Sequence, residues 1–265
     1  MEIVGENIVR AEVSPPQQIR RGRVFVRIYA TLIALATVAF VALLFLVRDK
    51  DILYGIDVPV TRAIQGVHWP LYAWVLTHTS DLGFYPLNVV AYAAVIGALY
   101  ALELRIEAAL GLVSSVLAGL IGGLIKMAIR RVRPSGSLVH VTAVLHDYSF
   151  PSGHVIQYVT LFGFTFFATW VAWRSSIPRN LVLAVLTLLV LLVGPSRVYL
   201  GEHWPSDVFG AYCLAGLWLA GTIELLLALK PRLGPRWNGR PYRRRFAPLT
   251  LPARMHGSTR TALHR

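Results

Sequence analysis

Residues 196–207 read SRVYLGEHWPSD and lie between two long apolar stretches. His203 and Asp207 are four residues apart, and Pro205 suits the first turn of a helix, where its missing N–H costs nothing. An aspartate in that turn can accept the proton on one imidazole nitrogen and leave the other nitrogen free to attack. Arg197 adds a planar guanidinium suited to phosphate oxygens. Ionisable groups beside apolar sequence usually have a function. The alternative for this stretch is a water-facing loop with an incidental histidine and aspartate.

A second stretch, residues 126–134, reads KMAIRRVRP and closes another apolar run. Arg133 lies seven residues beyond Lys126, which is about two helical turns. Both cations therefore point into the helix bundle if the helix persists that far, although the proline that follows Arg133 biases it away from helix. We expect Arg130 and Arg131 to lie at the membrane interface, in contact with lipid phosphates.

Residues 151–154 read PSGH and open the next apolar run. At the start of a helix, Ser152 and Gly153 offer backbone N–H groups and the positive end of the helix dipole to an anion. The alternative is a simple helix start, with Ser152 as the cap and His154 as a lone interfacial histidine.

Together the patterns K-x6-R-P, P-S-G-H and S-R-x5-H-x3-D, in this order, resemble the signature of the type 2 phosphatidic acid phosphatase superfamily. Its members include membrane lipid phosphatases, soluble bacterial acid phosphatases and vanadium-dependent haloperoxidases. Every signature position is filled, and the resemblance extends from about Tyr85 to Leu229.

This resemblance implies a role for each matching residue. His203 matches the nucleophile that forms a phosphohistidine, Asp207 the carboxylate that orients it, and His154 the acid that protonates the leaving oxygen. The residues that match the phosphate-binding cradle are Lys126, Arg133, Ser152, Gly153 and Arg197. No metal or other cofactor is expected, because these side chains already supply the positive charge and the sequence lacks the carboxylate cluster of a two-metal phosphatase.

The composition indicates a helical membrane protein, since 55% of the 265 residues are hydrophobic. The single cysteine, Cys213, excludes a disulfide within the chain and a multi-cysteine zinc site. A net charge of +13 is compatible with nucleic-acid binding, but the positive charges cluster before the first and after the last apolar run. We therefore expect the bilayer and a lipid substrate as partners, and no nucleic acid.

The predicted fold is all-α, a polytopic membrane protein with six transmembrane helices. A membrane domain at residues 28–229 is flanked by a basic disordered arm (residues 1–27) and a basic disordered tail (residues 230–265). The six spans are expected at residues 28–47, 85–102, 108–129, 151–173, 181–193 and 207–229. The fifth is short, so it either extends past Pro195 or tilts little.

Smaller features are also expected around these spans. A short amphipathic helix is predicted at residues 58–67, and His78 and Asp81 are interpreted as a polar cap over the bundle. In the third span, small residues recur every four positions and allow another helix to approach closely. They are Gly111, Ser115, Gly119 and Gly123.

Charge distribution predicts the orientation. Of the 26 Lys and Arg residues, 18 lie in the two flanks and in the turns on the same side of the membrane. The positive-inside rule assigns that side to the cytoplasm. Both termini are then cytoplasmic, and the three motifs meet at the outer face of the cell membrane.

The predicted function is a metal-independent membrane phosphatase that acts on a lipid phosphomonoester or pyrophosphate. Phosphatidate, phosphatidylglycerol phosphate and undecaprenyl pyrophosphate all present a terminal phosphate to the cradle. Alternatives are a lipid phosphotransferase that uses the same site, a vanadium-dependent haloperoxidase, and a non-catalytic transporter or scaffold.

Overall fold

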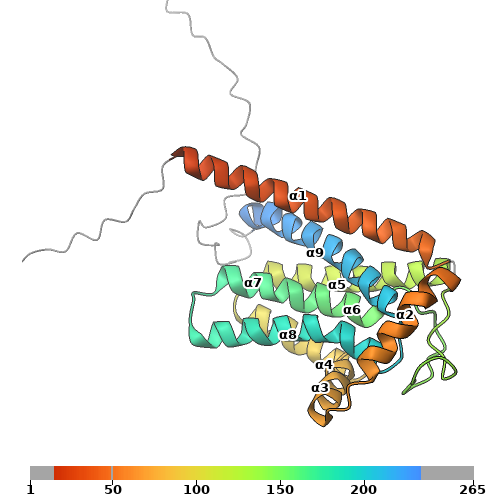
Figure 1. Ribbon diagram of the computed structural model, residues 1–265. Coiled ribbons are helices and arrows are strands. Elements are labelled where there is room, and N and C mark those ends of the chain that lie inside the picture. Colours follow the sequence, from red (N-terminus) through yellow and green to blue (C-terminus); the bar gives the residue numbers. More distant parts are fainter. Residues whose placement is uncertain (1–14, 49, 234–265) are drawn as a thin grey trace, which may run out of the picture.

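The computed structural model describes residues 15–48 and 50–233, and all regular elements in this part of the chain are helical (Figure 1). The helices, in chain order, are α1 (Pro15–Leu46), α2 (Lys50–Gln65), α3 (Pro70–Asp81), α4 (Leu87–Ala101), α5 (Arg105–Ile129), α6 (Gly153–Tyr158), η1 (Val159–Gly163), α7 (Phe164–Ala172), α8 (Ile177–Tyr199) and α9 (Pro205–Leu233).

Five segments are long and apolar enough to cross a bilayer, which makes this a multi-pass membrane protein. They are Val26–Leu46, Arg105–Ile129, Gly153–Ala172, Ile177–Tyr199 and Pro205–Leu233. The third of these is one continuous helix, in which the π-helical turn η1 joins α6 to α7. The predicted span at residues 85–102 corresponds to α4, an apolar helix of 15 residues. Its length of about 22 Å is less than the roughly 30 Å of hydrocarbon in a bilayer.

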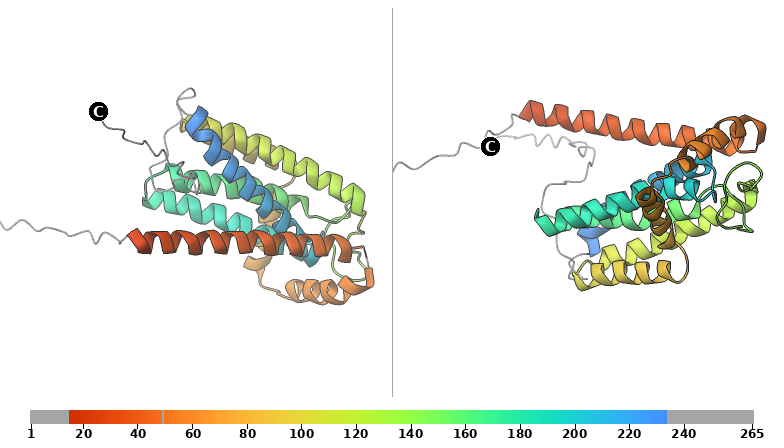
Figure 2. Two further views of the ribbon diagram at one scale, coloured as in Figure 1. Left: turned by 90° about the horizontal axis from the view of Figure 1, so that it is seen from above. Right: turned by 60° about the horizontal axis from the view of Figure 1, so that its bottom comes forward.

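The long helices run side by side, and their connections gather at the two ends of the bundle (Figures 1 and 2). The continuous helix from α6 to α7 is central, in contact with α5, α8 and α9, while α1 packs along α9 and α4 along α5. Helix α2 packs across α8 and α9 at one end, beside the long connection from α5 to α6 (Figure 1). This end holds all three motifs.

Small residues let α5 approach the central helix closely. A side chain at Gly111 would contact the Phe164 ring at 3.0 Å, and one at Gly119 would overlap with Gln157. Gly123 faces open space, whereas a Cβ at Gly122 would lie 2.7 Å from Ile156 Cδ1. The predicted stripe therefore drifts, because a spacing of four exceeds the 3.6 residues of a helical turn.

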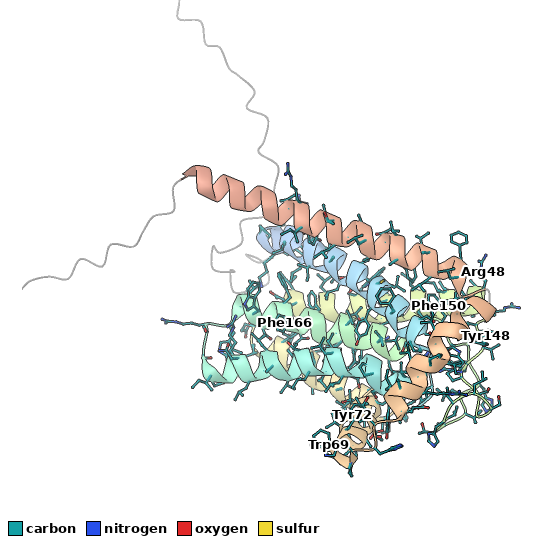
Figure 3. The ribbon with its side chains drawn as sticks, viewed as in Figure 1. Arg48, Trp69, Tyr72, Tyr148, Phe150 and Phe166 are labelled. Carbon is teal, nitrogen blue, oxygen red and sulfur yellow. The ribbon has the colours of Figure 1, made fainter. Side chains whose placement is uncertain are left out.

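An aromatic side chain anchors the chain immediately before the PSGH motif. Phe150 is fully buried between α1 and α9, stacked on Phe40 at a centroid distance of 6.2 Å (Figure 3). A Cβ at Gly210 of α9 would lie 2.5 Å from the Phe150 ring, so the glycine makes room for it. Tyr148, two residues earlier, is exposed at the end of the bundle (Figure 3).

Several predicted boundaries are wrong at the helix ends. Helix α1 already begins at Pro15, so the predicted disordered arm is incorrect for residues 15–27, while residues 1–14 lie outside the described part. Proline at a first turn followed by good helix formers can extend an apolar helix outward. Helix α2 begins at Lys50 rather than at residue 58, and α3 was not predicted.

The last two helices are also longer than predicted. Helix α8 continues past Pro195 to Tyr199, which is one of the two alternatives stated above. Helix α9 reaches Leu233, where we predicted tail from residue 230 onward. Lys230 is buried because its Nζ lies 2.5 Å from Glu107 Oε1 of α5, an ion pair that keeps this last turn in the bundle. Residues 234–265 of the tail lie outside the described residues.

Candidate active site

The three motif stretches meet at one end of the bundle and are joined by hydrogen bonds. The Ser149 N–H donates to the Arg131 carbonyl at 2.8 Å, linking the residues just before the second motif to the first motif. The indole Nε1 of the fully buried Trp204 donates to the Val132 carbonyl at 3.1 Å, linking the third motif to the first. Sequence segments far apart in the chain therefore form one composite site.

Helix α5 ends within the first motif, so the last residues of the motif are not helical. Helix α5 stops at Ile129, and Arg130 caps it in the left-handed conformation with a φ of 54°. The expectation that Lys126 and Arg133 share one helix face is therefore wrong, as the bias of Pro134 against helix at Arg133 had allowed. The two cations still converge, because the chain folds back toward Asp147.

Asp147 lies between the two cations of the first motif. Lys126 Nζ is 2.8 Å from Asp147 Oδ2, and Arg133 Nη2 is 2.6 Å from Asp147 Oδ1. Burial alone would raise the pKa of Asp147, but Lys126 and Arg133 lower it to about 2. The Asp147 side chain is still 56% exposed. Two cations thus hold two oxygens of one accessible anion, which is also the geometry of phosphate recognition.

His203 is buried beside this pair of cations. Arg133 Nη1 lies 3.3 Å from His203 Nε2. A guanidinium can only donate, so Nε2 accepts and the proton of the neutral ring is on Nδ1. Burial lowers the pKa of His203 well below its ordinary value, and the charges of Arg133 and Arg197 lower it further. The imidazole is therefore neutral, with the lone pair of Nε2 directed toward the cradle.

Asp207 faces the other nitrogen of this ring, but not at hydrogen-bonding distance. The separation between His203 Nδ1 and Asp207 Oδ2 is 3.7 Å. Asp207 Oδ2 instead accepts from the Trp204 N–H at 2.9 Å and from the Ser149 hydroxyl. The carboxylate is fully buried and fixed by these donors. A movement of less than 1 Å would complete the contact with the imidazole, given that such bonds span about 2.7–3.2 Å.

Arg131 is the third donor to Asp207, and its position corrects our expectation. Its Nη1 lies 2.5 Å from Asp207 Oδ1, and its Nη2 lies 2.6 Å from Asp57 Oδ2 on α2. Arg131 is 5% exposed, so it does not lie at the membrane interface. Two buried carboxylates draw it inward, since a buried charge requires a partner. The neighbouring Arg130 is exposed, with its Nε 3.1 Å from the Met127 carbonyl.

Arg197 occupies the last turn of α8 and is completely buried. It forms an ion pair with Glu202, donates to the Ser80 hydroxyl, and lies with its Cζ 5.0 Å from the centre of the Phe84 ring. The protein therefore already binds most of this guanidinium, and only its Nε is without a partner among the described residues.

His154 and Ser152 each bring a buried polar atom without a partner. His154 packs edge-on against Phe84 at a centroid distance of 4.5 Å, directly over Gly83, where a Cβ would overlap with the imidazole. Within the described residues, His154 Nε2 and Ser152 Oγ have no hydrogen-bond partner. Buried polar atoms are normally paired, so these two atoms are available to a ligand.

The backbone at the start of α6 differs in part from the expected cradle. The Ser152 N–H donates to the Asp207 carbonyl at 3.3 Å, so it is engaged within the protein. A Cβ at Gly153 would have no atom within 4 Å, which leaves open space next to that residue. Among the two positions, Gly153 has the more accessible backbone.

The loop of the third motif depends on Gly201. Its φ is +65°, and a Cβ there would overlap with the His140 carbonyl. Gln65 at the end of α2 donates to the carbonyls of His140 and Tyr199, at 2.7 and 2.9 Å. Helix α2 thus holds the third motif against the connection from α5 to α6.

Sequence reasoning missed Asp57, Arg131, Asp147 and Glu202 as members of the site. Each is an acidic or basic partner of a residue in a motif stretch. These pairs form only after the loops fold, so their partners are not evident from the sequence. Arg131 and Glu202 lie inside motif stretches, and the spacing of five residues between Arg197 and Glu202 allows that pair. In residues 15–48 and 50–233, no three His, Cys, Asp or Glu side chains are placed to hold a metal ion.

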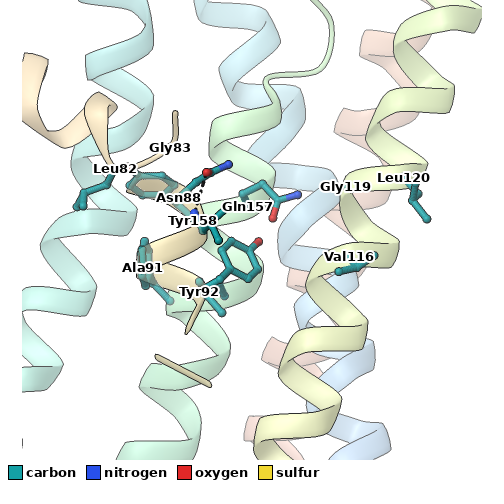
Figure 4. Close-up of a pocket in the computed structure, with 13 residues that line it drawn as sticks. Leu82, Gly83, Asn88, Ala91, Tyr92, Val116, Gly119, Leu120, Gln157 and Tyr158 are labelled. Atoms are coloured by element: carbon teal, nitrogen blue, oxygen red, sulfur yellow. Dashed lines mark hydrogen bonds between the residues drawn. The ribbon is translucent and has the colours of Figure 1, made fainter. Parts of the chain in front are cut away.

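A largely apolar pocket of about 480 Å³ lies between α4, α5 and the central helix (Figure 4). Gly83, over which the His154 ring packs, forms part of its wall. Its other lining residues are Leu82, Asn88, Val89, Ala91, Tyr92, Val116, Gly119, Leu120, Gln157, Tyr158, Leu161 and Phe162. The pocket therefore lies beside the surroundings of His154, with Gly83 common to both.

Comparison with known proteins finds curated relatives. The chain is 33% identical over 112 residues to an undecaprenyl-diphosphatase of Sulfolobus acidocaldarius, covering 41% of this chain and 49% of that protein. It is 34% identical over 97 residues to phosphatidylglycerophosphatase B of Bacillus subtilis, covering 36% and 46%. The chain thus spans about half the length of the curated relatives it matches.

A solved structure agrees in fold. The transmembrane PAP2-type phosphatidylglycerolphosphate phosphatase from Bacillus subtilis superposes with a TM-score of 0.62 at 20% identity, over 73% of this chain and 94% of that one. The model of the PAP2 superfamily matches residues 107–230, which contain all three motifs. This match and the two relatives confirm the resemblance inferred from the motifs.

Proposed function

We propose that this protein is an integral membrane lipid phosphatase that works through a phosphohistidine on His203. The observation that carries the proposal is that Lys126 and Arg133 both form ion pairs with the exposed carboxylate of Asp147. Arg133 Nη1 also lies 3.3 Å from His203 Nε2. A phosphoryl group that replaces the Asp147 carboxylate would meet both cations and the lone pair of His203 at once.

The first chemical step uses the tautomer assigned above. His203 Nε2 forms a bond to phosphorus while the bond from phosphorus to the lipid oxygen breaks. Lys126 and Arg133 neutralise the equatorial phosphate oxygens, as fixed cations do in phosphoryl transfer. Positive charge that develops on the imidazole is stabilised by Asp207 on the Nδ1 side. Because these groups supply the charge, the proposed reaction is independent of metal ions.

His154 is proposed to move the protons. In its protonated form it gives the Nε2 proton to the departing lipid oxygen, and in the second step it takes a proton from the attacking water. Water then cleaves the bond between nitrogen and phosphorus, which releases inorganic phosphate and restores His203. The unpaired state of His154 Nε2 supports this assignment.

The lipid nature of the substrate is supported by the membrane helices and by the pocket in Figure 4. A hydrocarbon chain in this pocket would pass Gly83 and bring its head group toward His154. The matched relatives are named for a prenyl diphosphate and for phosphatidylglycerophosphate, which are both lipid phosphates. We accordingly propose a lipid phosphomonoester or pyrophosphate as the substrate.

We further propose six spans, with α4 as the sixth and the active site at the outer face. Support comes from the count of basic residues, because 18 of the 26 belong to the flanks and turns that we predicted on the side opposite the motifs. With six spans both termini lie in the cytoplasm. The short α4 then requires local thinning of the bilayer or flanking residues that reach the interface.

The function is tested by phosphate release in detergent from phosphatidate, phosphatidylglycerol phosphate and undecaprenyl pyrophosphate, with the His203→Ala protein as the blank. At least one lipid should be hydrolysed, and chelation with EDTA should leave the rate unchanged, because side chains provide the cations. Loss of activity on chelation that a divalent ion restores would refute metal independence. A rate equal to the blank for every lipid would refute the phosphatase itself.

The roles of the two histidines are separated by the leaving group. Removing the acid for an alkoxide should cost on the order of 10²–10⁴ in rate, whereas p-nitrophenolate leaves without a proton. In a single turnover, His154→Ala should therefore lose most of its rate of phosphoryl transfer from the lipid and keep a larger share of the rate from p-nitrophenyl phosphate, whereas His203→Ala should lose both. Equal losses for His154→Ala, together with survival of His203→Ala on the activated ester, would require the roles to be exchanged.

The orientation is tested with single cysteines at the two ends of the bundle. Ser137 lies exposed in the connection from α5 to α6, and Ser175 lies exposed in the turn from α7 to α8. In intact spheroplasts, a membrane-impermeant maleimide should label Ser137→Cys, and should label Ser175→Cys only after permeabilisation. The parent protein is the control, because its one cysteine, Cys213, is buried. The reverse labelling pattern would move the site to the cytoplasm.

A further inference from the structure

We propose that Arg131 and Asp57 are positioning residues that hold Asp207, and through it His203, in the reactive arrangement. This inference rests on the proposed function and deepens it. Neither residue belongs to the positions that the three motifs assign to nucleophile, acid or phosphate cradle. Both are buried, at 5% and 1% exposure, and Arg131 lies between the two carboxylates.

The first argument is geometric. Arg131 Nη1 donates to Asp207 Oδ1 at 2.5 Å and to Ser206 Oγ at 2.7 Å. Asp57 accepts from the Ser206 N–H at 2.9 Å and from its hydroxyl at 2.6 Å. Asp57 therefore caps the first turn of α9 from another helix and fixes the turn that carries Asp207.

The second argument concerns charge. Arg131 alone beside Asp207 would cancel the negative charge that faces the imidazole. Asp57 at 2.6 Å from the other guanidinium nitrogen restores one net negative charge to this group of three. Asp207 can then stabilise the positive charge that develops on His203 as its Nε2 bonds to phosphorus. The arrangement fixes the carboxylate without neutralising it.

The third argument is that Arg131 and Asp57 are separate from the residues proposed to bind phosphate. The cradle cations Lys126 and Arg133 pair with Asp147, and no hydrogen bond or ion pair found in the described residues joins Arg131 or Asp57 to any of these three. Loss of Arg131 or Asp57 should therefore slow the chemical step and leave binding of the phosphate head unchanged. A residue needed only for stability would instead lower the amount of folded enzyme.

The test compares neighbouring arginines. Arg131→Lys keeps the charge, but a single ammonium cannot reproduce the two-sided guanidinium contact. Its kcat on a lipid phosphate, per folded protein, should fall by ~10- to 100-fold, because small misplacements near the chemistry have effects of this size, while KM stays within about twofold. Arg130→Lys is the matched control, since that side chain is exposed, and it should equal wild type. Asp57→Asn should also lower kcat at constant KM.

Coupling to Asp207 gives a readout that a purely structural role would not change. In an Asp207→Asn background, Arg131→Lys should cost little further activity, because its action passes through the carboxylate. Full multiplication of the two losses would overturn the inference, as would unchanged kcat in Arg131→Lys and Asp57→Asn. A loss explained entirely by less folded protein would overturn it as well. If wild type and Arg130→Lys release no phosphate, the proposed function fails instead.

Discussion

The site depends on the hydrogen bonds that hold the buried carboxylate of Asp207. This carboxylate accepts hydrogen bonds from Arg131, from the Ser149 hydroxyl and from the Trp204 N–H, so one side chain joins the first motif, the third motif and the residues just before the second. An unpaired carboxylate at this depth would be very unfavourable, and the surrounding loops have to supply donors for it. The same donors determine where the first turn of α9 lies and therefore where His203 lies.

The other charges of the site follow a common pattern, in which every cation already has a carboxylate. Arg197 pairs with the buried Glu202, and Arg131 pairs with the buried Asp57 and Asp207. These pairs are permanent parts of the fold because both members are enclosed. The pair of cations around Asp147 differs, since this carboxylate is 56% exposed and can be replaced by an anion from solution or from a lipid.

This difference explains how a site rich in positive charge is stable before substrate binds. Lys126 and Arg133 would repel each other if no anion were near them. Asp147 supplies that anion from the connection between the first and second motifs, where its charge screens the cations. A phosphate with close to two negative charges competes well for the same two donors, particularly through the bidentate fork of Arg133.

The sequence was sufficient for the family resemblance and the helical membrane architecture, and the roles of the motif residues stay predictions. It failed where the outcome depends on how loops fold. Arg131 was expected at the membrane interface, because nothing in a row of arginines reveals that Asp57, 74 residues earlier, lies beside it. The partnership of Asp147 was invisible for the same reason. Two helix ends were also misplaced. Helix α1 begins earlier than predicted, at Pro15, and α9 continues past Lys230, which forms an ion pair with Glu107.

The central claim is that His203 Nε2 becomes phosphorylated, and direct detection of this intermediate tests it. The His154→Ala protein should accumulate it from p-nitrophenyl phosphate, because the base that activates water in the second step is absent. After alkaline denaturation, ³¹P NMR and peptide mapping should find an acid-labile phosphoryl group on Nε2 of His203. A phosphoryl group on Nδ1, on another residue such as Ser152, or on none under conditions of turnover would contradict the account.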